Sequence, residues 1–174
     1  MTVSTDRGAN VVGAFALAVV DRMERAIFDH TDLGGEAVAA LVAIGHSSGM
    51  TIKQLSKVLA RSHPGTVRIV DRLAVASLIE RKPGVLDRRS VTLSLTGEGV
   101  AERAAILQRR MSALEDVLSA VAAGDFDTLQ RIAATTLATL PDDATSALAT
   151  CRLCDERRCA ACPMEPFGLP TQPH

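Results

Sequence analysis

The segment from Thr51 to Leu95 constrains the fold most, because two short helix signals stand directly before a hairpin signal. Thr51 and Gln54 have the spacing of a capping box, which marks a helix start. Ser62 can cap a second helix that has Pro64 in its first turn. Two short helices in succession, followed by a hairpin, predict a winged helix-turn-helix.

The hairpin signal consists of two strand-like runs, residues 78–82 and residues 90–95. The second run alternates apolar and polar side chains, as a half-buried strand does. The loop between the runs, residues 83–89, contains the sequence Asp87-Arg88-Arg89. The hairpin is therefore expected to be a wing with a basic tip.

Helical patterns flank this unit on both sides. We predict a helix over residues 11–30 after a frayed polar start, a second helix over residues 36–46, and a long amphipathic helix from about residue 100 to residue 121. Gly124 is expected to interrupt the long helix, Asp125 to cap another helix ending near residue 140, and residues 144–150 to add one more turn. The expected fold class is thus mainly α, with a small β-hairpin.

Three parts follow from these patterns. Residues 11–34 and 100–150 form a helical dimerisation region, residues 35–99 form the winged helix, and residues 151–174 form a Cys-rich C-terminal segment. The flanking helices leave apolar surface without a partner in one chain. Pairing with a second copy would cover that surface, so we expect a homodimer.

The composition fits a globular helical protein without a membrane span. Only 2% of the residues are aromatic, so the core must consist of Ala, Val, Leu and Ile. No apolar run approaches the roughly 20 residues that a membrane helix needs. The most apolar early run, residues 11–20, lacks the features of a signal peptide, and a cytoplasmic location is the expectation.

The charges are distributed unevenly along the chain. Residues 51–110 contain twelve Lys or Arg against five Asp or Glu, whereas the remaining residues contain seven against fifteen. A basic middle between acidic ends is typical of a nucleic-acid-binding module. A solvated charged face without a partner is the alternative that charge alone leaves open.

The chain resembles the MarR family of bacterial winged-helix repressors. The resemblance lies in Gln54-Leu55-Ser56, in residues 67–73 and 78–81, and most specifically in the run from Asp87-Arg88-Arg89 to Leu95-Thr96-Gly97-Glu98-Gly99. It covers about residues 11–140. It implies a dimeric regulator that binds double-stranded DNA, acts as a repressor and is released by a signal, often a small aromatic effector. The family usually has Gly at the position of Ser77.

In a helix-turn-helix the second helix enters the major groove with its N-terminal residues at the base edges. The candidate contacts are Ser62, His63, Thr66, Arg68 and Arg72. Arg68 is the candidate for direct guanine readout, with a phosphate contact as its alternative. Ser62 and Thr66 suit phosphate positioning.

The wing supplies the remaining candidates. The resemblance implies that one wing arginine, Arg89 rather than Arg88, enters the minor groove, with Asp87 as a turn-former and orienter.

The four cysteines of the chain all lie within twelve residues, as Cys151-x2-Cys154-x4-Cys159-x2-Cys162. Two Cys-x2-Cys motifs at this spacing suit a structural zinc ion in tetrahedral coordination. An iron–sulfur cluster, reversible disulfides of a redox sensor and an inert reduced tail are the alternatives. Loss of a cluster or oxidation of the thiols would offer a second kind of signal.

An enzyme is not expected. Four thiolates would saturate zinc and leave no position for a substrate, and the sequence has no Ser/His/Asp arrangement or Gly-rich phosphate loop. A remote alternative is an interaction adaptor that does not bind DNA.

Overall fold

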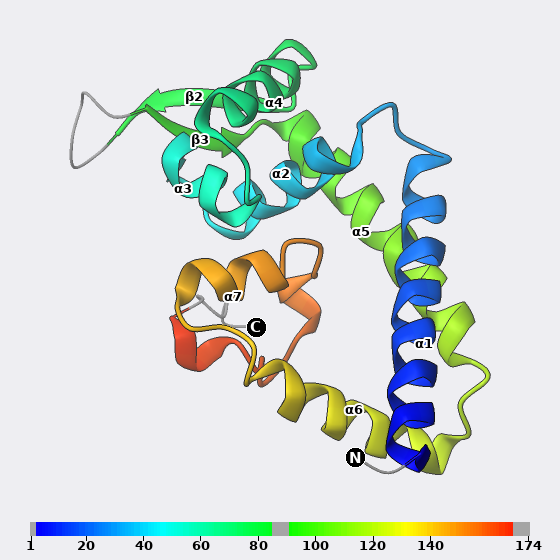
Figure 1. The fold of residues 1–174 in the computed structure, drawn as a ribbon. Coiled ribbons are helices and arrows are strands. Elements are labelled where there is room, and N and C mark those ends of the chain that lie inside the picture. Colours follow the sequence, from blue (N-terminus) through cyan, green and yellow to red (C-terminus); the bar gives the residue numbers. More distant parts are fainter. Residues whose placement is uncertain (1–2, 85–90, 169–174) are drawn as a thin grey trace.

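The computed structural model describes residues 3–84 and 91–168 and is mainly helical, with a small three-stranded sheet (Figure 1). The elements in chain order are α1 (Val3–Phe28), α2 (Gly35–His46), β1 (Met50–Thr51), α3 (Ile52–Val58), α4 (His63–Val75), β2 (Ile79–Pro83), β3 (Val91–Leu95), α5 (Gly97–Leu118), α6 (Ala123–Leu137), α7 (Ala144–Thr150), and the short 3-10 helices η1 (Glu156–Arg158) and η2 (Glu165–Phe167).

The winged helix is built around α2. Residues 37–44 of this helix are all buried, because its sequence is apolar on every side and α4, α5 and β3 surround it. Both expected helix caps are present. The Thr51 hydroxyl accepts a hydrogen bond from the backbone N–H of Gln54 in a full capping box, and the Ser62 hydroxyl accepts one from Gly65.

The sheet has the order β1-β3-β2, and both pairs are antiparallel. The register of the hairpin runs from Ile79 opposite Leu95 to Pro83 opposite Val91. The sequence gives no sign of β1, because two residues are too few for an alternating pattern. The loop residues Asp87, Arg88 and Arg89 lie outside the described residues.

Two residues explain why the stretch around the wing has its particular sequence. The Thr96 hydroxyl caps α5 by accepting from the N–H of Gly99, and it donates to the Ser77 carbonyl at 2.6 Å. A Cβ at Gly99 would lie 1.8 Å from the Leu78 carbonyl oxygen. Glycine is therefore needed where α5 starts against the backbone that leads into β2.

Helix α1 begins at Val3, so the expectation of a frayed start before residue 11 is wrong. Asp6 in the first turn favours the helix through the helix dipole, and the polar residues that follow remain in solvent. The helix runs alongside α5 (Figure 1). Ile27, near its end, is buried, whereas Val12, Phe15 and Leu17 are exposed.

The boundary between α5 and α6 also differs from the expectation. The interruption falls at residues 119–122, Gly124 lies inside α6, and Asp125 stands in the first turn without capping the helix. No side chain of α6 is buried.

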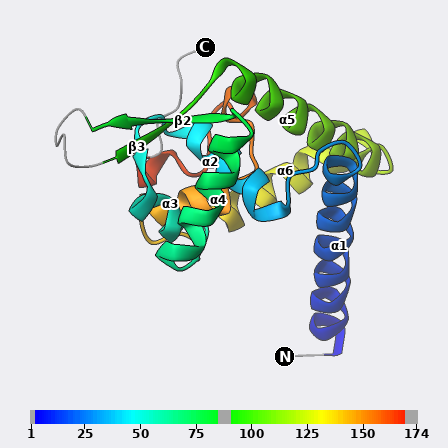
Figure 2. The same cartoon turned by 90° about the horizontal axis from the view of Figure 1, so that it is seen from above.

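The C-terminal part folds back onto the winged helix. Helix α7, present as expected, packs on α3, and its Leu148 joins the main core. Both views show α7 and the segment after it beside α2 and α3 rather than extended away from them (Figures 1 and 2). The described helices include none with the length and apolar character that crossing a membrane would require.

Candidate functional site

The exposed face of α4 presents His63, Arg68 and Arg72, three of the candidates for DNA contact. Their positions follow from the helix period, because Ile69, Val70 and Leu73 point into the core and leave the cationic side chains outside. The helix is amphipathic, with its basic side chains exposed, and it lies at the opposite end of the molecule from α6 (Figure 1).

The expected role of Thr66 needs correction, whereas that of Ser62 stays a prediction. Thr66 is fully buried, and its hydroxyl donates to the Ser62 carbonyl at 3.1 Å, so its side chain is not available to a base or a phosphate. The Ser62 side chain is exposed, and its hydroxyl accepts the capping hydrogen bond from Gly65 while its O–H can still donate to a phosphate. Helical spacing alone predicted Thr66 near the surface, because the sequence does not show how α4 packs against α3.

Several exposed cations around α4 are already partly compensated. Arg61 pairs with Glu36, Arg81 with Asp71 at 2.5 Å, and Lys82 with Glu80 at 2.5 Å. Exposed pairs of this kind contribute only about 0–1 kcal/mol. Among the described residues, no ion pair with Arg68, Arg72, Lys53 or Lys57 is found, so these four cations are the freer ones for phosphate contacts.

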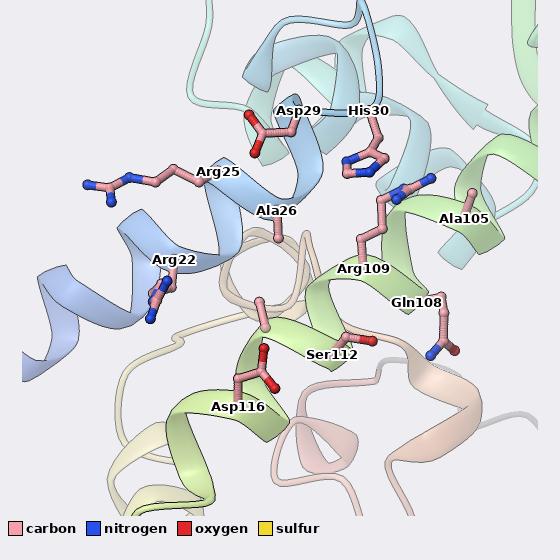
Figure 3. A pocket seen from close by; sticks show the side chains of 11 residues that line it. Arg22, Arg25, Ala26, Asp29, His30, Ala105, Gln108, Arg109, Ser112 and Asp116 are labelled. Carbon is pink, nitrogen blue, oxygen red and sulfur yellow. The ribbon is translucent and has the colours of Figure 1, made fainter.

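A cavity of about 690 Å³ lies between α1 and α5. Arg22 and Arg25 line it from α1 and Arg109 from α5, with Asp29 and Asp116 as the acidic members (Figure 3). The lining thus has more cationic than anionic side chains, which suits a small anion. The sequence indicated both helices but not this cavity, because it depends on how α1 crosses α5.

The four cysteines are close together, in two pairs. Cys151 is buried against Met164 and packs with Cys154 and Cys162 in one small cluster, and all four are reduced. Within the described ranges, no group of three or more His, Cys, Asp or Glu side chains is placed so that it could hold a metal ion. The spacing therefore brings the cysteines together, and zinc or an iron–sulfur cluster at this segment stays a prediction.

The thiols of Cys151, Cys154 and Cys159 differ in pKa. A hydrogen bond from the Cys151 thiol and the charge of Arg110 lower the pKa of Cys154 to about 6, against burial, which acts to raise it. The same hydrogen bond, together with burial, raises the pKa of Cys151. Burial and the neighbouring Cys162 raise the pKa of Cys159 to about 11.

A buried polar network joins the cysteine segment to the winged helix, and sequence reasoning missed it. Arg103 of α5 donates to Glu156 at 2.5 Å and to the Val42 carbonyl at 3.4 Å. His46, at the end of α2, lies 3.0 Å from the Cys154 carbonyl oxygen and 3.4 Å from the Glu156 carboxylate. Burial lowers the pKa of His46.

One signal for this network was in the sequence. Arg103 stands on the otherwise apolar face of α5, three residues before the buried Ile106. Its counterpart is Gly45, where a Cβ would lie 2.3 Å from Arg103 Nε. A charged residue on a core-facing stripe implies a buried partner, although the sequence does not identify Glu156 as that partner.

Comparisons with known proteins give one family match and a set of similar folds. The model of the MarR family matches residues 31–90. No curated protein sequence matches the chain.

Among solved structures, a MarR family protein from Bacillus stearothermophilus has a TM-score of 0.68 at 18% identity, with 78% of this chain and 95% of that chain covered. The reduced form of MarR from E. coli has a TM-score of 0.62 at 23% identity, covering 72% and 95%. A mutant of MepR from S. aureus bound to an oligodeoxyribonucleotide has a TM-score of 0.56 at 16% identity, covering 76% and 97%. These likenesses show the winged-helix fold.

Proposed function

We propose that the chain is a dimeric DNA-binding regulator of transcription that acts as a repressor. The match of the MarR family model to residues 31–90, and the fold that most of the chain shares with solved MarR proteins, support this proposal. The observation that carries the proposal is the exposed cationic face of α4, which presents His63, Arg68 and Arg72. Ser62 caps the N-terminus of this helix.

In this proposal α4 lies in the major groove. The N-terminal residues of such a helix lie at the base edges, and Arg68 stands in the first half of α4. Arg68 reads guanine through a bidentate contact, worth about 1–3 kcal/mol of discrimination. Arg72, Lys53 and Lys57 contact phosphates. The MepR structure that resembles this chain holds an oligodeoxyribonucleotide, which supports the same use of the fold here.

The wing extends the contact beyond α4. Arg88 and Arg89 stand at the turn of the hairpin in the sequence, and a narrow minor groove attracts arginine. We assign Arg89 to the groove and Asp87 to the turn.

The test compares a duplex that the protein selects from a randomised pool with an unrelated duplex. Binding to both should weaken steeply between 50 and 200 mM salt, since phosphate contacts release counterions. Arg68→Ala should weaken binding to the selected duplex by about ten- to a hundredfold and leave the unrelated duplex nearly unchanged. Lys57→Ala, the matched phosphate variant, should weaken both equally.

Three results would contradict different parts of the proposal. Absence of binding to any duplex at low salt would favour the adaptor that does not bind DNA. An equal loss on both duplexes for Arg68→Ala would reduce Arg68 to a phosphate contact. If Arg88→Ala with Arg89→Ala leaves affinity unchanged, the wing assignment is wrong.

The cavity between α1 and α5 is our candidate for the effector site, because Arg22, Arg25 and Arg109 make it suitable for an anion. An aromatic carboxylate such as benzoate is the probe. It should release the selected duplex from the unmodified protein and do so at least tenfold less effectively from Arg25→Ala. Equal release from both proteins would remove the cavity from the proposal.

A further inference from the structure

The winged helix is joined to α5 and to α6 by two separate stretches of the chain. Helix α5 starts directly after β3 and extends toward α1 (Figure 2). The other stretch leaves the end of α6 and returns to the winged helix, where α7 packs on α3 and Leu148 joins the main core. We call residues 144–158 the brace, because they contact α3, α2 and α5 together.

One buried guanidinium fastens the brace. Arg103 of α5 is 8% exposed, and it donates to the Glu156 carboxylate at 2.5 Å and to the Val42 carbonyl of α2 at 3.4 Å. Beside it, the Cys154 carbonyl oxygen accepts from His46 at the end of α2, at 3.0 Å. Polar contacts at a single buried place thus join α5, α2 and the brace.

Helix α2 is shaped to receive this guanidinium. A Cβ at Gly45 would lie 2.3 Å from Arg103 Nε and 2.4 Å from its Cδ, so glycine is needed for the arginine to pass. Glycine inside a helix is less stable than alanine, and a buried ion pair adds little net stability over apolar side chains. Stability alone therefore explains neither feature, and both point to a role in placing the brace.

The joint between α5 and the winged helix lies at Thr96 and Gly99, where α5 begins against the backbone that leads into β2. The brace contacts α5 further along, at Arg103 and at Gln108, whose side chain accepts from Arg158 at 3.3 Å. Rotation of a rigid unit about such a joint is a common domain motion. A contact away from the joint opposes it strongly, because a given angle displaces that contact further. The brace therefore fixes the angle between the winged helix and α5.

In a dimer held together by α1 and α6, this angle decides how far apart the two α4 helices lie. We propose that Arg103 and Glu156 are positioning residues for DNA recognition, which set the spacing of half-sites that the dimer accepts. Dimers of helix-turn-helix proteins bind half-sites about one turn of DNA apart, so each spacing requires its own separation of the recognition helices. This role rests on the proposed function, whereas the brace itself does not.

Hydrogen–deuterium exchange of the full chain tests the brace without DNA. Glu156→Gln should speed amide exchange in α7 by about tenfold or more, because the brace loses its buried ion pair and opens locally. Exchange in β2, whose hydrogen bonds run to β3, should change much less. Glu36→Gln, which breaks the exposed Glu36–Arg61 pair at the start of α2, should leave α7 unchanged.

Two exchange results would overturn the proposal. No rise in α7 for Glu156→Gln would show that the pair does not fasten the brace. A rise of the same size in β2 would show a general loss of stability rather than local opening.

The DNA measurement uses the selected duplex and two relatives, in which one base pair is added or removed between the half-sites. The unmodified protein should bind both relatives about tenfold or more weakly than the selected duplex, because DNA or protein must deform to fit them. For Glu156→Gln this difference should shrink to about threefold or less, since a winged helix that is free to turn adapts to each spacing at a similar ordering cost. Glu36→Gln should keep the full difference.

A double variant separates positioning from stability. Arg103→Met with Glu156→Gln removes both charges, so no uncompensated charge stays buried and the free energy of unfolding should return close to that of the unmodified protein. Its preference among the three duplexes should stay as small as that of Glu156→Gln, because the brace is still unfastened. Recovery of the full preference together with the stability would overturn the positioning role.

Failure of the proposed function gives a different result from failure of the positioning role. If the unmodified protein binds no duplex, the regulator proposal fails and the spacing role with it, while exchange in α7 still shows whether the brace exists. If the unmodified protein binds the selected duplex but prefers no spacing, the regulator proposal stands and the positioning role is wrong.

Discussion

Ser77 has a left-handed backbone conformation, with φ of 58°, at the turn between α4 and β2. The N–H of Leu78 donates to the Leu73 carbonyl, a 6→1 bond that places Ser77 where the Schellman motif usually has glycine. The glycine that resembling proteins have at this position thus has a physical reason, and Ser77 adopts the same conformation at the cost of Cβ crowding.

Ser77→Gly should therefore stabilise the protein. The free energy of unfolding should rise by about 1 kcal/mol, since a left-handed non-glycine residue costs about that much or more. Urea unfolding at fixed protein concentration measures it. Ser119→Gly is the matched control, because Ser119 has φ of −60° and gains nothing from glycine. Equal changes in the two variants would show that φ is not the cause.

Gly99 is a second position where backbone geometry decides the residue. Gly99→Ala should lower the free energy of unfolding by more than about 2 kcal/mol, because the added Cβ would overlap the Leu78 carbonyl oxygen. Gly97→Ala, two residues earlier in the same helix turn with open space at its Cβ, should be neutral or slightly stabilising. Unfolding midpoints of the two variants test this, and a small loss for Gly99→Ala would contradict the close approach.

Between elements, the Arg103–Glu156 pair is the contact that fastens the C-terminal segment to α5. The two side chains are 8% and 11% exposed. A buried pair adds little net stability against apolar substitutes, but removing one partner leaves an uncompensated buried charge. The pair therefore acts mainly by fixing where the segment lies.

Glu156→Gln should lower the free energy of unfolding by about 3 kcal/mol, because Arg103 loses its anion in a buried setting. Glu36→Gln breaks the Glu36–Arg61 pair, whose side chains are about half exposed, and should cost less than about 1 kcal/mol. Chemical unfolding of both variants measures the difference. Similar losses would mean that water reaches Arg103 readily.

At the scale of the whole molecule, α1 and α6 expose apolar surface that nothing covers within the described part of a single chain. Val12, Phe15 and Leu17 of α1 and Ile132 of α6 are exposed, and Phe15 lines an apolar hollow with Phe126 and Leu129 of α6. Contiguous exposed apolar surface marks an interaction site, and a second copy is the partner that the proposed function requires.

Phe15→Glu should convert a dimer into a monomer, since it places a charge in an apolar interface. Mass photometry or analytical ultracentrifugation at micromolar concentration measures the change, and DNA affinity should fall with it. Val75→Glu is the control, because Val75 is 88% exposed on α4, away from α1 and α6. A dimer that survives Phe15→Glu would locate the interface elsewhere.

The sequence by itself determined the winged helix and the existence of the flanking helices. Capping residues such as Thr51 and Ser62 act on the next three residues, and the alternation in residues 90–95 is set by the pleat of one strand. Such signals are local, so the sequence contains them in full. The clustering of the cysteines was predictable for the same reason, because two Cys-x2-Cys motifs within twelve residues keep the four sulfurs close together.

Only the tertiary structure decided which of these side chains are exposed and which distant residues they contact. Thr66 is buried because α4 packs across α3, Arg103 finds Glu156 53 residues away, and Arg110 comes to Cys154 from 44 residues away. Packing of distant elements sets such contacts, and no local period encodes it. For this reason the sequence predicted the four-cysteine cluster, whereas only the fold shows that the Arg110 guanidinium lies 3.9 Å from Cys154 Sγ.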